Sequence, residues 1–147
     1  MPGPQGSAGL AAGARGMAST VVTEADTALA AGSGDVPVLA TPRLLALAEA
    51  ATVAAVTPQL AAGQTSVGTA ARLEHRRASP VGTLVTAEAE LTGIDGPRLS
   101  FAFTAWQDSD VARPGDRDPA TVIAAGTIDR VVVDRAAFLA RATRPPG

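Results

Sequence analysis

The feature that most constrains this chain is one long apolar segment, ATPRLLALAEAATVAAVTPQL, which runs from Ala40 to Leu60. Its pattern predicts a helix with Thr41 as the N-cap and Pro42 as the first helical residue, where a missing N–H costs nothing. Thr57 marks the end, because a residue before proline avoids the helical conformation. Between them the helix is apolar almost all round. Such a helix is typically buried, so the rest of the chain has to cover it.

Beyond Gln64 the apolar residues recur at every second position, which is the period of β-strands. Three stretches of this kind follow one another, and Asp95-Gly96 between the second and third indicates a hairpin. Their shared faces are Val67, Thr69, Ala71, Leu73 and His75; Val85, Ala87, Ala89 and Leu91; and Leu99, Phe101, Phe103 and Ala105. We also expect a first strand around Ser19–Glu24, a long hairpin loop over 108–120, a last strand over 121–133 with Gly126 as a bulge, and a short terminal helix over 135–141.

The predicted order is therefore one strand, one long helix and four strands joined largely by hairpins, which is an α+β layout. An all-round apolar helix favours an antiparallel sheet that wraps around it, the hotdog fold; a helix on a flat sheet is the alternative. The 147 residues suit one domain with a real core. We place it at residues 17–141, and we expect residues 1–16 and 142–147 to be disordered.

The composition excludes several classes of function. Cysteine is absent and all 12 basic residues are arginine, which excludes disulfides, thiolate metal sites, Schiff bases and a P-loop lysine. One histidine without cysteine argues against a zinc site. A net charge of −2 gives no field that attracts nucleic acid or an anionic membrane. With no membrane span and no convincing signal peptide, we expect a cytoplasmic protein.

The single histidine, His75, is the simplest general base at neutral pH, although a lone histidine is also a common structural or surface residue. Glu49 lies in the apolar helix, where its neighbours one turn away offer no cation. A carboxylate there needs a partner, and we expect His75 on the covering sheet to be that partner. The alternative is that Glu49 lies on a solvent-exposed stripe of the helix. Thr41 is either a plain N-cap or a hydroxyl beside helix N-terminal amides that stabilise developing negative charge.

The run VLATPRLLALAEAATVAAVTPQLAAGQTSVGTAARLEHRRASPVG, with PRLSFAFTAW and AAGTIDRVVVDRAAF later in the chain, resembles the fluoroacetyl-CoA thioesterase family of the hotdog superfamily. The likeness covers about residues 18–141. It implies that Thr41, Glu49 and His75 are catalytic and that Gly68 is the family glycine. A strand glycine of this kind is either a bulge or a point where the thioester or pantetheine arm approaches the backbone closely.

Two departures from the family pattern limit what the resemblance implies. The family's fluoroacetyl-specific member has a lid phenylalanine, whereas the corresponding segment here is Gly34-Asp35-Val36-Pro37, with no aromatic residue. The family's last-strand motif contains a second histidine, whereas the corresponding residues here, Gly126 to Arg130, read GTIDR and contain none. We therefore expect Val36 to contact the substrate, without implying fluoroacetyl selectivity. Arginines near the histidine, Arg76 and Arg77 above all, are candidates for contact with the phosphates of CoA.

The spacing of the candidate residues predicts a dimer. Thr41 and Glu49 are eight residues apart, about 12 Å along a helix, so they do not reach one acyl carbon within a single helix. Gly68 and His75 are about 23 Å apart on an extended strand. Two antiparallel helices across a two-fold axis would bring Thr41 of one subunit near Glu49 of the other. We therefore expect a C2 homodimer with two sites at its interface.

The sequence thus favours an enzyme, a thioesterase that hydrolyses a small or medium acyl thioester of CoA or a carrier protein. Glu49 paired with His75 would activate water or attack the carbonyl, Thr41 and helix amides would hold the oxyanion, and His75 would act as base or protonate the thiolate. No metal or cofactor is expected beyond the CoA of the substrate. The alternatives are a hotdog hydratase or dehydratase and a non-catalytic module that binds an acyl thioester or hydrophobic ligand.

Overall fold

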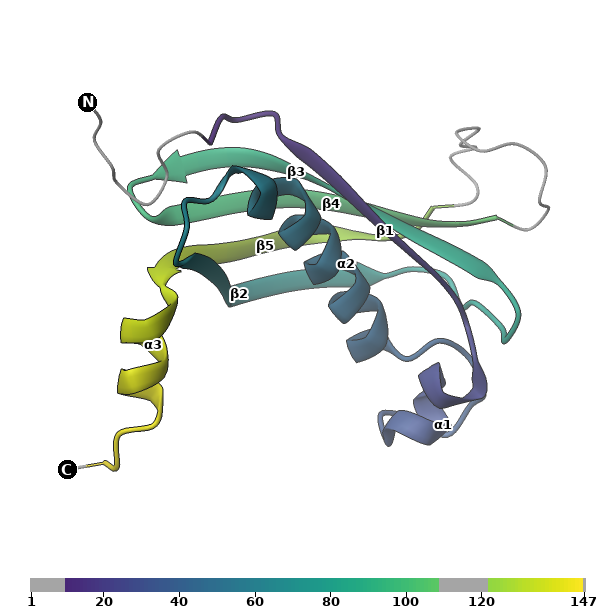
Figure 1. The fold of residues 1–147 in the computed structure, drawn as a ribbon. Helices are drawn as coiled ribbons and strands as arrows, with labels where there is room; N and C mark the ends of the chain where they lie inside the picture. Colours follow the sequence, from purple (N-terminus) through teal and green to yellow (C-terminus); the bar gives the residue numbers. More distant parts are fainter. Residues whose placement is uncertain (1–9, 109–121, 147) are drawn as a thin grey trace.

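The computed structural model describes residues 10–108 and 122–146. Five antiparallel strands form one sheet, which curls around a long helix (Figure 1). The strands are β1 (Arg15–Val21), β2 (Gln64–His75), β3 (Leu84–Asp95), β4 (Arg98–Asp108) and β5 (Val122–Asp134), in the spatial order β1-β3-β4-β5-β2. β1 and β2 are therefore the edge strands. The α+β class and the wrapped sheet are confirmed.

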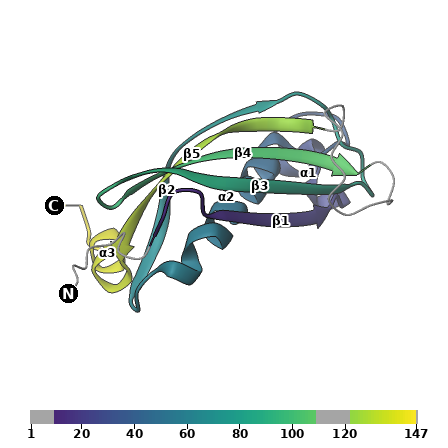
Figure 2. The same cartoon turned by 90° about the horizontal axis from the view of Figure 1, so that it is seen from above.

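The long helix α2 (Thr41–Val56) lies in the concave side of the sheet (Figure 2) and ends, as predicted, at the short 3-10 turn η2 (Thr57–Gln59). It is not buried all round within one chain. The sheet covers one side only, and the other side carries exposed small and apolar residues. The buried positions are Leu44, Ala48, Ala51, Thr52, Ala55 and Val56, and the exposed ones include Ala46, Ala50, Val53 and Ala54.

The core lies between α2 and the concave face of β3 and β4. The predicted apolar faces of these two strands are confirmed, because every member is at most 3% exposed. The Asp95-Gly96 hairpin is confirmed as well, since Asp95 pairs with Arg98 and Gly96 has a φ of 58°. Alternation along the strands thus fixes which side of the sheet receives the helix.

At a bulge in β2, the residues that face inward change from even-numbered to odd-numbered positions. Gly68 pairs with Arg130 of β5, and Ala70 pairs with the next residue of β5, Asp129, so Thr69 is the extra residue. Arg130 and Ile128 are both buried on the inner face of β5. Gly68 therefore faces inward before the bulge, and Ala71 opposite Ile128 faces inward after it. The predicted common face of β2 is correct for Ala71, Leu73 and His75 and wrong for Val67 and Thr69.

A short segment between β1 and α2 forms one wall of the region around the start of α2. It contains η1 (Glu24–Asp26) and α1 (Ala28–Ala31), neither of which was predicted, and then an extended stretch over 36–40. Backbone hydrogen bonds from Ala28 N–H to Val38 O (2.8 Å) and from Ala40 N–H to Asp26 O (2.9 Å) fold the extended stretch back onto the helices. The wall is therefore joined to the short helices by backbone hydrogen bonds.

Two expectations differ from the structure, and a third lies almost wholly outside it. The first strand begins at Arg15 and not around Ser19, and Leu10 and Ala14 before it pack against the core, so the expected disorder over residues 1–16 is wrong for residues 10–16, while residues 1–9 lie outside the described part. Gly126 is not a bulge: it stays in register, and a Cβ there would collide with the Arg72 carbonyl oxygen. The expected hairpin loop lies almost wholly outside the described residues.

The terminal helix α3 (Arg135–Ala142) projects from the end of β5 (Figure 1). Asp134 caps it, because its side chain accepts a hydrogen bond from Ala137 N–H at 2.8 Å. Among the described residues, no helix is both long and apolar enough to cross a membrane.

Candidate active site

Thr41 and His75 meet where α2 begins and β2 ends. Thr41 Oγ1 lies 2.9 Å from His75 Nδ1, a hydrogen-bond distance at which either group can donate, depending on the imidazole tautomer. The predicted N-cap role of Thr41 is wrong. Ala40 is the extended residue that precedes the helix and makes no side-chain cap, while the hydroxyl of Thr41 is directed to the histidine. This helix start therefore lacks a favourable cap and instead carries a hydroxyl–imidazole pair.

The other ring nitrogen of His75 is unsatisfied. Nε2 is buried and has no hydrogen-bond partner within the described residues. Burial lowers the pKa of His75, and the backbone of Arg77 raises it by less. The imidazole is therefore neutral at pH 7, with one nitrogen held by Thr41 and the other buried without a hydrogen-bond partner among the described residues. This is the state that a general base requires.

A surface pocket of about 280 Å³ opens at this pair. Four of the residues predicted from the sequence line it together: Thr41, His75, Arg76 and Arg77. Val36, the fifth, lines it from the wall described above. The side chain of Arg76 also donates to Glu74 Oε1 at 3.1 Å. The pocket thus combines a hydroxyl–imidazole pair, two arginine residues and an apolar wall.

Glu49 belongs to a second cluster, farther along α2. Glu49 Oε2 lies 3.6 Å from Arg130 Nη1, and the Arg130 side chain is only 8% exposed. Arg130 Nε donates to Ser66 Oγ at 2.9 Å, and Nη2 donates to the Ser66 carbonyl at 3.0 Å. A Cβ on Gly68 would lie 2.6 Å from Glu49 Oε2. The absence of a side chain at Gly68 therefore makes room for the carboxylate, and the bulge follows directly after it.

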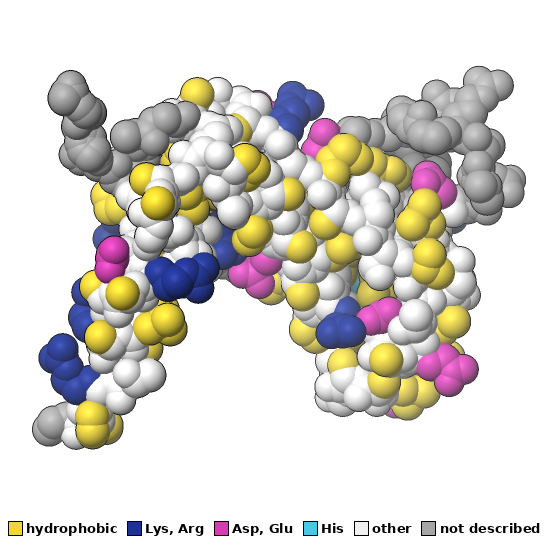
Figure 3. Space-filling model, viewed as in Figure 1, with side chains coloured by type: hydrophobic (Ala, Val, Ile, Leu, Met, Phe, Trp, Pro, Cys, Tyr) yellow, Lys and Arg dark blue, Asp and Glu magenta, His cyan; other side chains and the backbone are white. Residues whose placement is uncertain are grey.

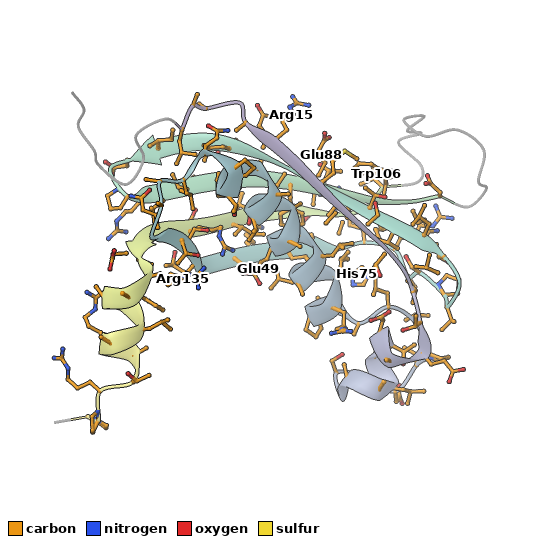
Figure 4. All side chains as sticks on the ribbon, viewed as in Figure 1. Arg15, Glu49, His75, Glu88, Trp106 and Arg135 are labelled. Carbon is orange, nitrogen blue, oxygen red and sulfur yellow. The ribbon has the colours of Figure 1, made fainter. Side chains whose placement is uncertain are left out.

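The predicted pairing of Glu49 with His75 is wrong within one chain. The cation beside Glu49 is Arg130, and Figure 4 shows Glu49 and His75 at different positions along α2 and β2. Eight residues of helix separate Thr41 from Glu49, about 12 Å. Glu49 does point toward the sheet, as expected, and its side chain is 40% exposed. One chain therefore brings Thr41 and His75 together and leaves Glu49 and Gly68 apart from them.

Arg130 was missed by the sequence analysis. One signal was available: in the last strand, Arg130 alternates with Ile128 and Val132, both of which are buried. An arginine at an inward position of an apolar strand needs a carboxylate or several acceptors. Burial lowers the pKa of Arg130 and the charge of Glu49 raises it, but a guanidinium stays charged at neutral pH. Which acceptor it meets depends on packing between distant parts of the chain.

Comparison with known proteins places these features in a family. The family model of the fluoroacetyl-CoA-specific thioesterase FlK matches residues 22–136. A curated fluoroacetyl-CoA thioesterase from Streptantibioticus cattleyicolor is 38% identical over 85 residues. That match spans 58% of this chain and 61% of the relative, so less than two thirds of the relative is aligned.

Solved structures agree over a longer part of the chain. A variant of the fluoroacetyl-CoA thioesterase FlK in complex with acetyl-CoA has a TM-score of 0.78 at 30% identity, covering 90% of this chain and 96% of that chain. A hot-dog-like protein from Thermanaerovibrio acidaminovorans has a TM-score of 0.77 at 19% identity, covering 92% and 93%, which supports the fold alone. With the family model matching most of its length, this chain belongs to the fluoroacetyl-CoA-specific thioesterase family.

Proposed function

We propose that this protein is an acyl-CoA thioesterase whose acid–base group is His75. The observation that carries the proposal is the pair of Thr41 Oγ1 and His75 Nδ1 at 2.9 Å, in a pocket that Arg76 and Arg77 also line. The acetyl-CoA bound to the FlK variant supports the class of substrate. Arginines suit the phosphates of CoA, because a guanidinium can make two parallel hydrogen bonds to phosphate oxygens.

The chemistry follows from the unsatisfied nitrogen of His75. Nε2 takes a proton as a water oxygen bonds to the thioester carbonyl carbon, and the carbonyl oxygen becomes an oxyanion. Thr41 and the N-terminal amides of α2 would stabilise that charge. As the C–S bond breaks, the imidazolium returns the proton to the thiolate. The carboxylate of Glu49 would assist by orienting the water or, in a covalent route, by attacking the carbonyl itself.

Glu49 can reach this chemistry in a homodimer. β2 is an edge strand, and its exposed run, residues 68–72, is centred on Ala70. Antiparallel pairing of two such strands about Ala70 would set Arg72 opposite the partner subunit's Gly68. Glu49, which contacts Gly68, would then come from the partner to within about 10 Å of His75 along the strand, against about 23 Å within one chain. The exposed apolar side of α2 supports a partner as well.

The direct test is thiol release from a panel of acyl-CoAs, from acetyl to medium-chain and arylacetyl, by the wild type and by His75→Ala. We expect the variant to lose about 100-fold or more in kcat/KM. Because no metal or redox cofactor is part of the proposal, a chelator is expected to leave the wild-type rate unchanged. Equal rates for the two proteins would remove His75 from the mechanism, and tight binding without release would indicate a binding module.

A further inference from the structure

The pocket beside Thr41 and His75 has two chemically different sides. Arg76 and Arg77 line one of them, and Ala28, Val36, Val38 and Leu39 line the other. A CoA thioester has the same division, because its phosphates and its acyl group lie on opposite sides of the reacting carbon. The arginines match the phosphates. The apolar side is therefore left for the acyl group.

The apolar side is a fixed wall. Leu39 N–H donates to the Ser79 carbonyl at 2.9 Å, while the Val38 carbonyl accepts from Ala28 on the opposite side of the extended stretch. At the base of the wall, Asp26 accepts from Arg43 Nη2 at 2.7 Å, which ties this segment to α2. A wall held on both sides cannot collapse onto a small group. An acyl group shorter than the wall leaves apolar surface in contact with water.

The side chains of the wall alternate between two pockets. Val36 and Val38 face the catalytic pocket, and Pro37 between them lines a neighbouring pocket with Leu29 and Val81. Figure 3 shows hydrophobic side chains gathered over this part of the molecule, around α1. Val36 is 49% exposed, so about half of its surface is open to be covered by a ligand.

We propose, on the basis of the thioesterase function above, that the acyl group is an uncharged aliphatic chain longer than acetyl, which packs against Val36 and Val38. The pocket volume of about 280 Å³ equals that of about nine liquid water molecules, so it has room beside the arginines for more than a single methyl group, and a chain of about four to six carbons covers more of the wall. Each methylene that covers the wall is expected to raise kcat/KM by up to about fourfold.

The test compares acetyl-, butanoyl-, hexanoyl- and succinyl-CoA as substrates of three proteins: wild type, Val36→Phe and Val21→Phe. We expect the wild type to prefer butanoyl and hexanoyl over acetyl by about tenfold or more, and to discriminate against the charged succinyl group. Val36→Phe fills the wall side and should lower the hexanoyl-to-acetyl ratio by about tenfold. Val21 is 51% exposed and lines neither pocket, so Val21→Phe should leave that ratio unchanged.

A second measurement separates this inference from the proposed function. Calorimetry with S-alkyl-CoA thioethers, which cannot be hydrolysed, should show affinity that rises from S-ethyl to S-hexyl in the wild type and Val21→Phe but not in Val36→Phe. If no acyl-CoA is hydrolysed but thioether affinity still rises with chain length, the thioesterase function is overturned and the apolar wall remains the chain-binding surface. Hydrolysis that is fastest with acetyl-CoA, with no rise in thioether affinity, would overturn the inference and keep the thioesterase.

Discussion

At the scale of single residues, we expect the fall of kcat/KM at acidic pH to follow the protonation of His75. Because burial lowers its pKa, the imidazole stays neutral to a lower pH than an ordinary histidine, whose pKa is about 6.5. The fall of kcat/KM at acidic pH should therefore be centred below pH 6.5, as protonation removes the base. Stopped assays of kcat/KM across pH 4.5–8 check this range. A limb centred above 6.5, or an identical limb in His75→Gln, would assign the titration to another group.

Arg130 is expected to stabilise the fold and to position Glu49. In Arg130→Met, the carboxylate of Glu49 loses the cation beside it and Ser66 loses two donors. We expect the free energy of unfolding in urea to fall by about 1–3 kcal/mol, because Glu49 is partly solvated and water replaces some of the loss. Arg15→Met is the matched control, since Arg15 is 61% exposed and its pair with Glu90 should contribute less than about 1 kcal/mol.

A double-mutant cycle with Glu49→Gln completes that experiment. If Arg130 acts through Glu49, the double variant should lose less stability and less activity than the sum of the two single variants. Strict additivity in both readouts would mean that Arg130 stabilises only β2, through Ser66, and has no part in positioning the carboxylate.

Single residues also show which parts of the site could be predicted from the sequence. His75, Thr41 and the two arginines after His75 share a pocket because a helix start and a strand end, both visible in the sequence, lie on the same side of the fold. The partner of Glu49 was not predictable in the same way. His75 was the conspicuous choice, but the ion pair is with Arg130, 81 positions away. Choosing between two distant partners depends on strand order and register, which composition and spacing do not determine.

At the scale of elements, β2 leaves room for the Glu49 carboxylate at Gly68. In Gly68→Ala the new Cβ would lie 2.6 Å from Glu49 Oε2, so the end of the Glu49 side chain must move. We expect kcat/KM to fall by about tenfold or more, with a change in stability of at most about 1 kcal/mol, because a flexible carboxylate can yield where backbone cannot. Gly93→Ala is the control, since its Cβ would meet only Ser100 at an ordinary 3.7 Å. Unchanged activity in Gly68→Ala would separate Glu49 from the reaction.

Elements differ in how well their sequence defines them. The inner faces of β3 and β4 follow strict alternation, and the helix boundaries follow their prolines, because both signals are local. The bulge in β2 gives no such signal. It is required because Gly68 must face Glu49 while His75 faces Thr41, and seven residues of regular strand would set them on opposite faces. A glycine was noted there, but only pairing with β5 shows which residue is extra.

At the scale of the whole molecule, the shared site of the proposed dimer can be tested by mixing two inactive variants. His75→Ala and Glu49→Ala, unfolded and refolded together, form mixed dimers. If each site takes His75 from one chain and Glu49 from the other, one site of every mixed dimer is intact, and roughly a quarter of wild-type activity should return. Each variant refolded alone is the control. Sedimentation should give a dimer; recovery of no activity from mixed dimers would place both residues of a site in one chain.

The extra residue in β2 has a consequence for how this chain can change over evolutionary time. Removing Thr69 together with the bulge would leave Gly68 and His75 six positions apart, and a regular strand would then keep both on the inner face. A strand of the present length without the bulge would turn Ala71, Leu73 and His75 away from the helix. A single insertion or deletion between Gly68 and His75 therefore preserves the site only if the bulge is lost with it, while changes of two residues preserve the orientation with the bulge retained. The distance between these two positions is constrained by parity as well as by length.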